Sequence, residues 1–392
     1  MINFRSKDFI SSHIKGILDF YLNNAIDPKG GFFQTLLPSG EQQNKTQKHL
    51  VSSARLTMVF ALAHKEWPEQ RYLDALKHGL SFIEEKHYDA ATKTYNWTLD
   101  GDAVTDTKNY CYGHAFIVLM YATLHKAGFA GAKEKLEESY QIMEDQLWEE
   151  QYGLYADEAS ADWSVVDPYR GQNANMHSCE AMIAAYEATQ EQRYLDRAMT
   201  IAKNICIRQT EDSNGLVWEH YDQDWKIDWD FNKDDPKNLY RPWGYQPGHL
   251  TEWTKLLLII NRYQPEAWLL ERAETLFQVA MDKAWDQKNG GLFYGFGPDG
   301  SICDDEKYFW VHAETLGAAA LLAQSSGKEQ YWQDYDRIWT YSWTAFCEEK
   351  HQPWWRLLDA QNKVIDPTIA SPGAKIDYHT VAAFIEVLHT LP

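Results

Sequence analysis

One pattern recurs along this 392-residue chain and limits the folds that it can adopt. A histidine stands at the start of an apolar stretch with helical periodicity six times, with gaps of 65, 63, 72, 63 and 67 residues. These histidines are His49, His114, His177, His249, His312 and His379. A regular internal period is typical of proteins built from one repeated supersecondary unit. The sequence therefore predicts six similar units whose helix starts converge on one place.

A second mark repeats with nearly the same period. Short turns rich in glycine or aromatic residues fall at positions 31, 95, 153, 215, 291 and 353, with gaps of 64, 58, 62, 76 and 62 residues. Both patterns have their longest gap around residues 218–245, which form a polar and aromatic insertion. Long loops in compact domains are usually functional. We therefore expect this insertion to form a rim or a lid at the site.

Each unit has room for two helices of different character. The histidine-led segments, such as residues 115–122 and 313–323, are apolar on all sides, whereas residues 134–146 and 266–283 alternate charged and apolar side chains. An amphipathic layer around an apolar layer indicates two concentric rings of helices. The predicted fold is all-α, an (α/α)6 barrel of six helical hairpins, with residues 1–392 in a single domain. An open superhelix would need polar caps at its ends, and the sequence shows none.

The formal charge of −20 argues against nucleic-acid and anionic-membrane partners, because nucleic-acid binding requires Lys and Arg to neutralise phosphates. No apolar run approaches the roughly 18 residues of a membrane span. The N-terminus lacks the basic and apolar regions of a signal peptide. The five cysteines include no Cys-x-x-Cys pair and are expected to be reduced thiols. We therefore expect a cytoplasmic protein with neither a nucleic-acid nor a membrane partner.

In a closed ring the inner helices run parallel, and their positively polarised N-terminal ends favour hydroxyl-rich or anionic ligands. The pairs His177/Glu180 and His249/Glu252 have the i, i+3 spacing at which a carboxylate can orient an imidazole. Imidazole suits proton transfer near neutral pH. His379 would approach His249 across the ring, so that one removes a proton while the other donates one. A structural hydrogen bond and a zinc or manganese site are the alternatives for these pairs.

Several other polar side chains are candidates for contacts with a sugar. Arg170, Gln172, Asn173 and Asn175 crowd into the run before His177 and offer fixed donors and acceptors to hydroxyl groups. The alternative for Asn175 is a helix N-cap.

Arg55 lies in an apolar helix, so it needs a partner, either a glutamate of the ring or the substrate. Trp253 and Trp310 flank the His and Glu positions and either stack on a sugar or fill the core. No Gly-rich phosphate loop and no Gly-x-Ser-x-Gly elbow is present. A glycosidase that uses two carboxylates stays open, because Asp and Glu are common in this chain.

Three runs, residues 49–55, 169–180 and 247–253, resemble the aldose–ketose isomerase branch of the N-acylglucosamine 2-epimerase superfamily. The resemblance covers nearly the whole chain. It implies an (α/α)6 barrel that uses no cofactor and no metal, with His249 and His379 as the catalytic acid–base pair. The substrate-binding residues that it implies are Arg55, Tyr112, Asn173, His177, Glu252, Trp310 and Glu314.

The activity implied by the resemblance is the interconversion of D-mannose and D-fructose, extending to D-lyxose and D-xylulose, through a cis-enediolate. His249 would move the proton between C2 and C1 and His379 would open the ring, or the two roles would be exchanged. A sugar 2-epimerase of the mannose/glucose or N-acylglucosamine type is the alternative, as is a sulfoquinovose isomerase. The latter needs cationic contacts, for which Arg170, Arg241 and Lys375 are candidates. A sugar-binding protein on the same scaffold is a further alternative. The expected partner is a monosaccharide, and both a monomer and a homo-oligomer fit the sequence.

Overall fold

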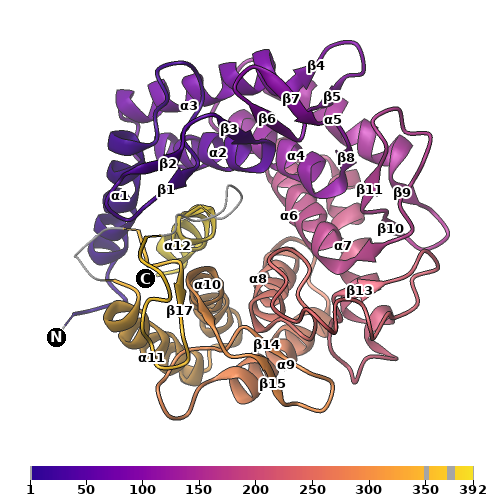
Figure 1. Ribbon diagram of the computed structural model, residues 1–392. Helices are drawn as coiled ribbons and strands as arrows, with labels where there is room; N and C mark the ends of the chain where they lie inside the picture. The colour runs from indigo at the N-terminus through magenta and orange to yellow at the C-terminus, as the bar shows by residue number, and fades with distance from the viewer. Residues whose placement is uncertain (1, 348–352, 369–375, 392) are drawn as a thin grey trace.

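The computed structural model describes residues 2–347, 353–368 and 376–391. Within these residues, helices form two concentric rings (Figure 1). The inner ring consists of α2 (Leu50–Glu66), α4 (Cys111–Lys126), α6 (Gln172–Thr189), α8 (Pro247–Tyr263), α10 (Phe309–Ser326) and α12 (Tyr378–Thr390). The outer ring consists of α1 (Lys7–Asn24), α3 (Gln70–Phe82), α5 (Ala132–Gln146), α7 (Gln192–Cys206), α9 (Ala267–Ala284) and α11 (Glu329–Ala345). The predicted (α/α)6 barrel is confirmed.

The two rings differ because their helices bury different amounts of surface. Every residue of α10 from Phe309 to Ala323 is buried, whereas α7 buries one stripe that includes Tyr194, Ala198 and Ile205. A helix that is apolar all round belongs in a core, and an amphipathic helix belongs at its surface. Small residues let the inner helices approach closely: a Cβ placed on Gly317 would lie 3.4 Å from Ala383 Cβ.

The ring is closed by contacts between the two ends of the chain. Helices α2 to α11 form five consecutive inner–outer hairpins, and α1 packs against α12 to make the sixth pair. The Tyr21 hydroxyl of α1 donates to Asp377 Oδ2 at 2.7 Å, immediately before α12. Since an outer helix returns between each inner helix and the next, the inner helices all run in one direction. We call the end at which they begin the front end and the other the rear end.

Very short strands, which the sequence did not predict, link neighbouring hairpins at the front end. β8 precedes α4 and pairs with β11, β12 precedes α6 and pairs with β13, and β16 precedes α10 and pairs with β17. Each ladder ties the start of an inner helix to the loop after the next outer helix, which fixes where that inner helix begins.

The strands are β1 (Thr35–Leu36), β2 (Gln42–Asn44), β3 (Gln47–His49), β4 (Tyr88–Asp89), β5 (Thr94–Tyr95), β6 (Thr98–Asp100), β7 (Ala103–Asp106), β8 (Asn109–Tyr110), β9 (Trp148–Glu149), β10 (Leu154–Tyr155), β11 (Glu158–Ala159), β12 (Arg170–Gly171), β13 (His220–Tyr221), β14 (Gly295–Phe296), β15 (Ile302–Asp304), β16 (Lys307–Tyr308) and β17 (Leu357–Leu358). A π-helical turn spans Ile83–His87, and a 3-10 turn spans Arg208–Thr210.

The insertion at residues 218–245 is packed as part of the front rim. It contains β13, and the buried Trp218 lies with ring centroids 4.6 Å from Trp229 and 5.1 Å from Tyr245. The five cysteines are free thiols, as predicted. Among the described helices, none has both the length and the apolar composition needed to cross a bilayer.

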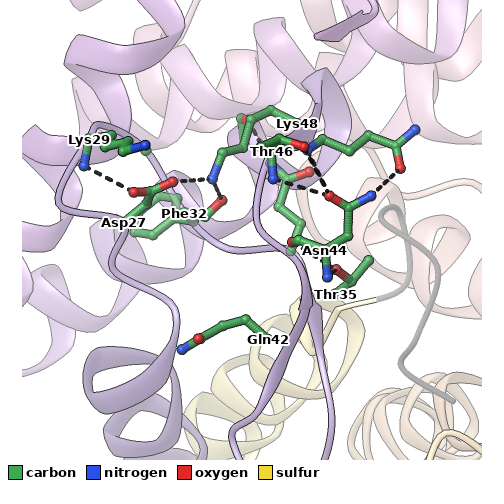
Figure 2. A network of polar contacts seen from close by, with 12 residues as sticks. Asp27, Lys29, Phe32, Thr35, Gln42, Asn44, Thr46 and Lys48 are labelled. Carbon is green, nitrogen blue, oxygen red and sulfur yellow. Dashed lines mark hydrogen bonds and ion pairs between the residues drawn. The ribbon is translucent and has the colours of Figure 1, made fainter. Parts of the chain in front are cut away.

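A buried ion pair anchors the loop in front of α2, as Figure 2 shows. Lys48 Nζ lies 2.7 Å from Asp27 Oδ2 and donates to the Phe32 carbonyl at 2.8 Å. The same arrangement recurs before α10, where Lys307 Nζ lies 2.8 Å from Asp286 Oδ2 and 2.7 Å from the carbonyl of Gly290. The repeat visible in the sequence therefore extends to individual polar contacts.

Replacing Lys48 with Met should lower the free energy of unfolding by about 3–5 kcal/mol, because it leaves a buried carboxylate without its cation. The side chains of Lys48 and Asp27 are only 5% and 6% exposed. Chemical denaturation measures the change. The control is Lys86→Met, which removes the exposed pair with Asp102 and should leave stability unchanged. A loss below about 1 kcal/mol for Lys48→Met, the range of surface pairs, would contradict the anchoring role.

Candidate active site

Side chains from the first turns of the inner helices meet at the front end of the barrel. His177 of α6, His249 of α8 and His379 of α12 lie around Trp310 of α10. The Trp310 ring centroid is 5.3 Å from that of His249 and 5.3 Å from that of His379. The His177 and His379 centroids are 6.2 Å apart. Three of the six recurring histidines therefore form one cluster.

His249 is oriented by a carboxylate from the insertion. Its Nδ1 lies 2.9 and 3.0 Å from the two carboxylate oxygens of Glu219. A carboxylate only accepts hydrogen bonds, so Nδ1 carries a proton, and in the neutral imidazole Nε2 has the lone pair. Gln172 Nε2 also donates to Glu219, and Trp253 Nε1 donates to Gln172 Oε1 at 2.7 Å. His249 thus has a fixed ring and a basic Nε2.

Glu252 does not orient His249, because the partner of Nδ1 is Glu219; the other role open to Glu252, binding substrate beside the imidazole, stays a prediction. The His249 ring turns toward the loop that carries β13, where Glu219 approaches it, and not along the axis of α8. Trp253 is fully buried and holds Gln172. It therefore fills the core, one of the two alternatives that the sequence left open.

His379 has an equivalent arrangement. Its Nδ1 donates to Glu314 Oε1 at 2.7 Å, and Lys255 Nζ donates to the other oxygen of Glu314 at 2.6 Å. Burial, together with the charges of Arg55 and its other cationic neighbours, holds the pKa of His379 well below the ordinary value. His379 is therefore neutral near pH 7 and offers Nε2 as a base.

The third histidine pairs with its own helix, as predicted. His177 Nδ1 donates to Glu180 Oε2 at 2.9 Å, and the Tyr378 hydroxyl donates to Glu180 Oε1 at 2.6 Å. Burial lowers the pKa of His177 to about 4. Burial alone would raise the pKa of Glu180, but the His177 hydrogen bond and the Lys255 charge lower it to about 2. The pair is a neutral imidazole on a carboxylate.

Arg55 supplies positive charge to the same cluster. It is 1% exposed, and its Nη2 donates to the Tyr112 hydroxyl at 2.8 Å. The guanidinium carbon lies 4.3 Å from the Phe116 ring centroid and 4.8 Å from that of Tyr378. Faces of aromatic rings attract cations. These contacts provide the partners that a buried Arg requires.

Glu252 is the most unusual group of the cluster. It is fully buried, and neither of its carboxyl oxygens has a hydrogen-bond partner in the described part of the chain. Three carboxyl groups, of Glu180, Glu252 and Glu314, face two permanent cations, Lys255 and Arg55. Burial and the neighbouring charge of Glu314 raise the pKa of Glu252 well above its usual value. This shift favours the neutral acid, which can donate a hydrogen bond to a ligand oxygen.

Asn173 lies in the first turn of α6, the helix that carries His177. Its Oδ1 is buried without a hydrogen-bond partner among the described residues. Asn175 lies inside α6 and is not the N-cap that the sequence allowed. Its amide binds the backbone of Tyr155 through both Oδ1 and Nδ2, at 2.8 and 2.9 Å.

The other three recurring histidines do not join the cluster, so the expectation that all six line the mouth is wrong. His49 Nδ1 accepts from the Val51 amide as the N-cap of α2. His114 contacts Asn109 Oδ1 at 3.3 Å. His312 binds the Tyr308 carbonyl through Nδ1 and accepts from the Leu292 amide at Nε2. His49 and His312 thus bind backbone groups near the starts of their helices, and His114 binds the side chain of Asn109 in β8.

Two of the three cations considered for a sulfonate are engaged elsewhere. Arg170 forms two bonds of 2.8 Å to Glu149. Arg241 donates to Glu158 at 3.2 Å and lies over the Tyr169 ring. Lys375 lies outside the described residues.

Two overlapping groups have donor types and spacings that suit a metal ion. Ligand atoms of His177, Glu180 and Glu252 lie within 4.8 Å of one another, as do those of Glu252, Glu314 and His379. Imidazole and carboxylate are common ligands of zinc and manganese. Lys255 already occupies one oxygen of Glu314, and with Arg55 it supplies positive charge at this position.

The family model of N-acylglucosamine 2-epimerase (GlcNAc 2-epimerase) matches residues 31–383. The chain belongs to this family. It is 47% identical to a D-mannose isomerase of Marinomonas mediterranea over 99% of this chain and 98% of the relative. A crystal structure of a D-mannose isomerase superposes with a TM-score of 0.97, at 46% identity and over 100% of both chains. Cellobiose 2-epimerase from Spirochaeta thermophila shares the fold at a TM-score of 0.86 and 21% identity, covering 98% of this chain and 96% of that one.

Sequence reasoning missed three groups of the cluster: Glu219, Lys255 and Tyr378. Glu219 lies in the insertion that the repeat pattern singled out, but nothing in the sequence paired it with His249. Lys255 had a usable signal, because it is a charged residue directly before the apolar run 256–260 of an inner helix. Tyr378 precedes His379 and could have been included with it.

Glu252 should give the carbonyl stretch of a protonated carboxyl group at pH 7, because a raised pKa keeps the proton bound until the pH exceeds that value. Infrared difference spectroscopy against Glu252→Gln measures this band, which the variant should lose while keeping wild-type stability. Glu180→Gln is the control and should retain the band, since Glu180 is ionised. A spectrum in which Glu252→Gln removes only carboxylate intensity would show that Glu252 is charged.

Proposed function

We propose that this protein is an aldose–ketose isomerase that interconverts D-mannose and D-fructose. The observation that carries the proposal is the pair His249 and His379, each with Nδ1 held by a carboxylate and the two separated by Trp310. Two fixed bases beside one aromatic ring suit proton transfer at adjacent carbon and oxygen atoms of a sugar. The D-mannose isomerase relatives support the same reaction.

In the proposed reaction His379 assists ring opening by moving protons at the sugar oxygens. His249 then takes the proton from C2 and returns it to C1, so that a cis-enediolate forms and collapses to the ketose. Glu252 as a neutral donor and Arg55 as a cation stabilise the negative charge that develops on the sugar oxygens. Tyr112, Asn173, His177, Trp310 and Glu314 bind or position the substrate. The exchanged assignment of His249 and His379 is the alternative.

The proposal includes D-lyxose and D-xylulose, which have the same configuration at the reacting carbons. It places the reaction on a single catalytic domain, residues 1–392, in the cytoplasm, and requires neither metal nor cofactor. A 2-epimerase is the second candidate, because it forms the same enediolate and returns the proton to the other face of C2. A sulfoquinovose isomerase is less favoured, since Arg170 and Arg241 are bound to Glu149 and Glu158.

Proton NMR of D-mannose incubated with the enzyme and EDTA in D2O tests the reaction. The expected result is D-fructose with incomplete deuterium at C1, because one histidine carries the proton between neighbouring carbons. D-Glucose as the first product would assign the protein to the epimerases. Loss of activity in EDTA would contradict a metal-free mechanism, and unchanged mannose and lyxose would overturn the isomerase proposal.

Glu219→Gln should lower kcat roughly 10²-fold with little change in KM, because the neutral amide no longer fixes the tautomer of a general base. Steady-state kinetics with D-mannose, followed by fructose formation, measures this effect. Glu211→Gln, in the exposed part of the segment that leads to Glu219, is the matched control and should retain full activity. An unchanged kcat for Glu219→Gln would remove His249 from the proposed base position.

A further inference from the structure

A cavity opens at the rear end of the barrel, where the inner helices terminate. Its volume is about 390 Å³. We call it the rear well; it is lined by residues of α2, α4, α6, α8 and α12. Its rim carries both positive and negative side chains: Lys126 pairs with Glu187 at 2.5 Å, and Arg262 pairs with Glu386. From Tyr378 near the bottom to His389 at the rim, α12 rises roughly 16 Å at about 1.5 Å per residue.

The bottom of the rear well is the underside of the candidate active site. Three residues that line it, Glu180, Lys255 and Tyr378, form what we call the floor. On the other side of the floor, Glu180 holds His177, and Lys255 holds Glu314 and through it His379. The floor is thus a layer one side chain thick between the histidines and a cavity open to the rear.

The rear well has the properties of a hydrated cavity. One water needs roughly 15 Å³ of such volume and two to four polar partners. The well exceeds that volume many times, and both its floor and its rim provide donors and acceptors. A mere packing gap between apolar helices would not need charged groups at its base. Burying Lys255 and Glu180 there costs free energy that nearby water reduces.

At the front end, a bound ligand reduces the access of solvent to the histidines. His177 and His379 are only 2% and 8% exposed without any ligand. A sugar seated against Trp310, as the proposed function requires, would cover them further. Their protonation could then equilibrate with solvent only by another route.

We propose that the rear well is a proton-exchange route, through which protons pass between solvent and the floor, and so to the His177 and His379 pairs, while a sugar covers the front end. A hydronium ion in the well gives a proton to the floor and leaves as water, and the reverse step returns it. Glu180, an ionised carboxylate, accepts and releases this proton, and Lys255 gives up one ammonium proton to water before it takes another back. The part of the proposal that concerns a bound sugar rests on the proposed function.

The test narrows the rear well without touching the floor. Ala184 and Ala382 line the well one helical turn beyond Glu180 and Tyr378. The double variant Ala184→Leu/Ala382→Leu places two isobutyl groups into the cavity directly above the floor. Ala188→Leu is the matched control, since Ala188 lies one turn further along α6 and does not line the well. Thermal unfolding of each variant verifies that it is folded, and each single substitution serves if the double variant is not.

The readout is the exchange of the Lys255 ammonium and His379 Nδ1 protons with water, measured by nitrogen-15 NMR with and without D-mannitol. This acyclic hexitol has no carbonyl group and cannot turn over. In the wild-type protein and in Ala188→Leu, exchange should persist with mannitol bound. In the double variant it should slow at least about tenfold. Unchanged exchange in the double variant would overturn the proposal, as would complete loss of exchange in the wild type on adding mannitol.

Failure of the proposed function would appear separately. If the front end does not bind hexoses or hexitols, mannitol leaves the Trp310 and His379 resonances unshifted. In that case slower exchange in the double variant than in Ala188→Leu without mannitol would still support the rear well as a route, and equal exchange in the two would overturn it.

Discussion

The ion pair between Lys255 and Glu314 is the contact on which the rest of the site depends. Their side chains are 5% and 0% exposed, so each would be strongly unfavourable without the other. Glu314 uses its second oxygen for His379; burial raises the pKa of Glu314, and the charge and hydrogen bond of Lys255 oppose that shift. Burial and the charge of Glu314 raise the pKa of Glu252, and Lys255 and Arg55 oppose that shift. The Lys255–Glu314 pair therefore acts on both His379 and Glu252.

The site is also a product of the ring and not of any one hairpin. Glu219 reaches His249 from the insertion after α7, and Glu314 of α10 reaches His379 of α12. The imidazoles consequently receive their orientation from different units. A fold with independent hairpins would leave these rings free to rotate, which would cost catalytic efficiency because the basic nitrogen must point at the substrate.

The sequence predicted the barrel because two independent patterns reveal the repeat: the polarity of the helical segments and the positions of the histidines. Both patterns follow from burial. In α10 and in α7, the polarity of each residue reflects whether that residue is buried. The sequence did not distinguish the three histidines of the cluster from the other three. His49, His114 and His312 occupy the same helix starts, and only the direction of each ring distinguishes them. The Glu219–His249 pair lies beyond the i, i+3 and i, i+4 spacings by which a helix reveals its partners.

The closure of the ring by α1 and α12 has a consequence for biosynthesis. Tyr21 and Asp377, which meet at 2.7 Å, are separated by almost the whole chain. At about 5–20 residues per second, a ribosome needs tens of seconds between making one and the other. Throughout that time α1 has apolar residues such as Ile10, Ile14 and Ile17 without their final cover. A nascent chain of this protein therefore exposes these residues until its last helix emerges, and a chain truncated before α12 lacks both His379 and the helix that closes the ring.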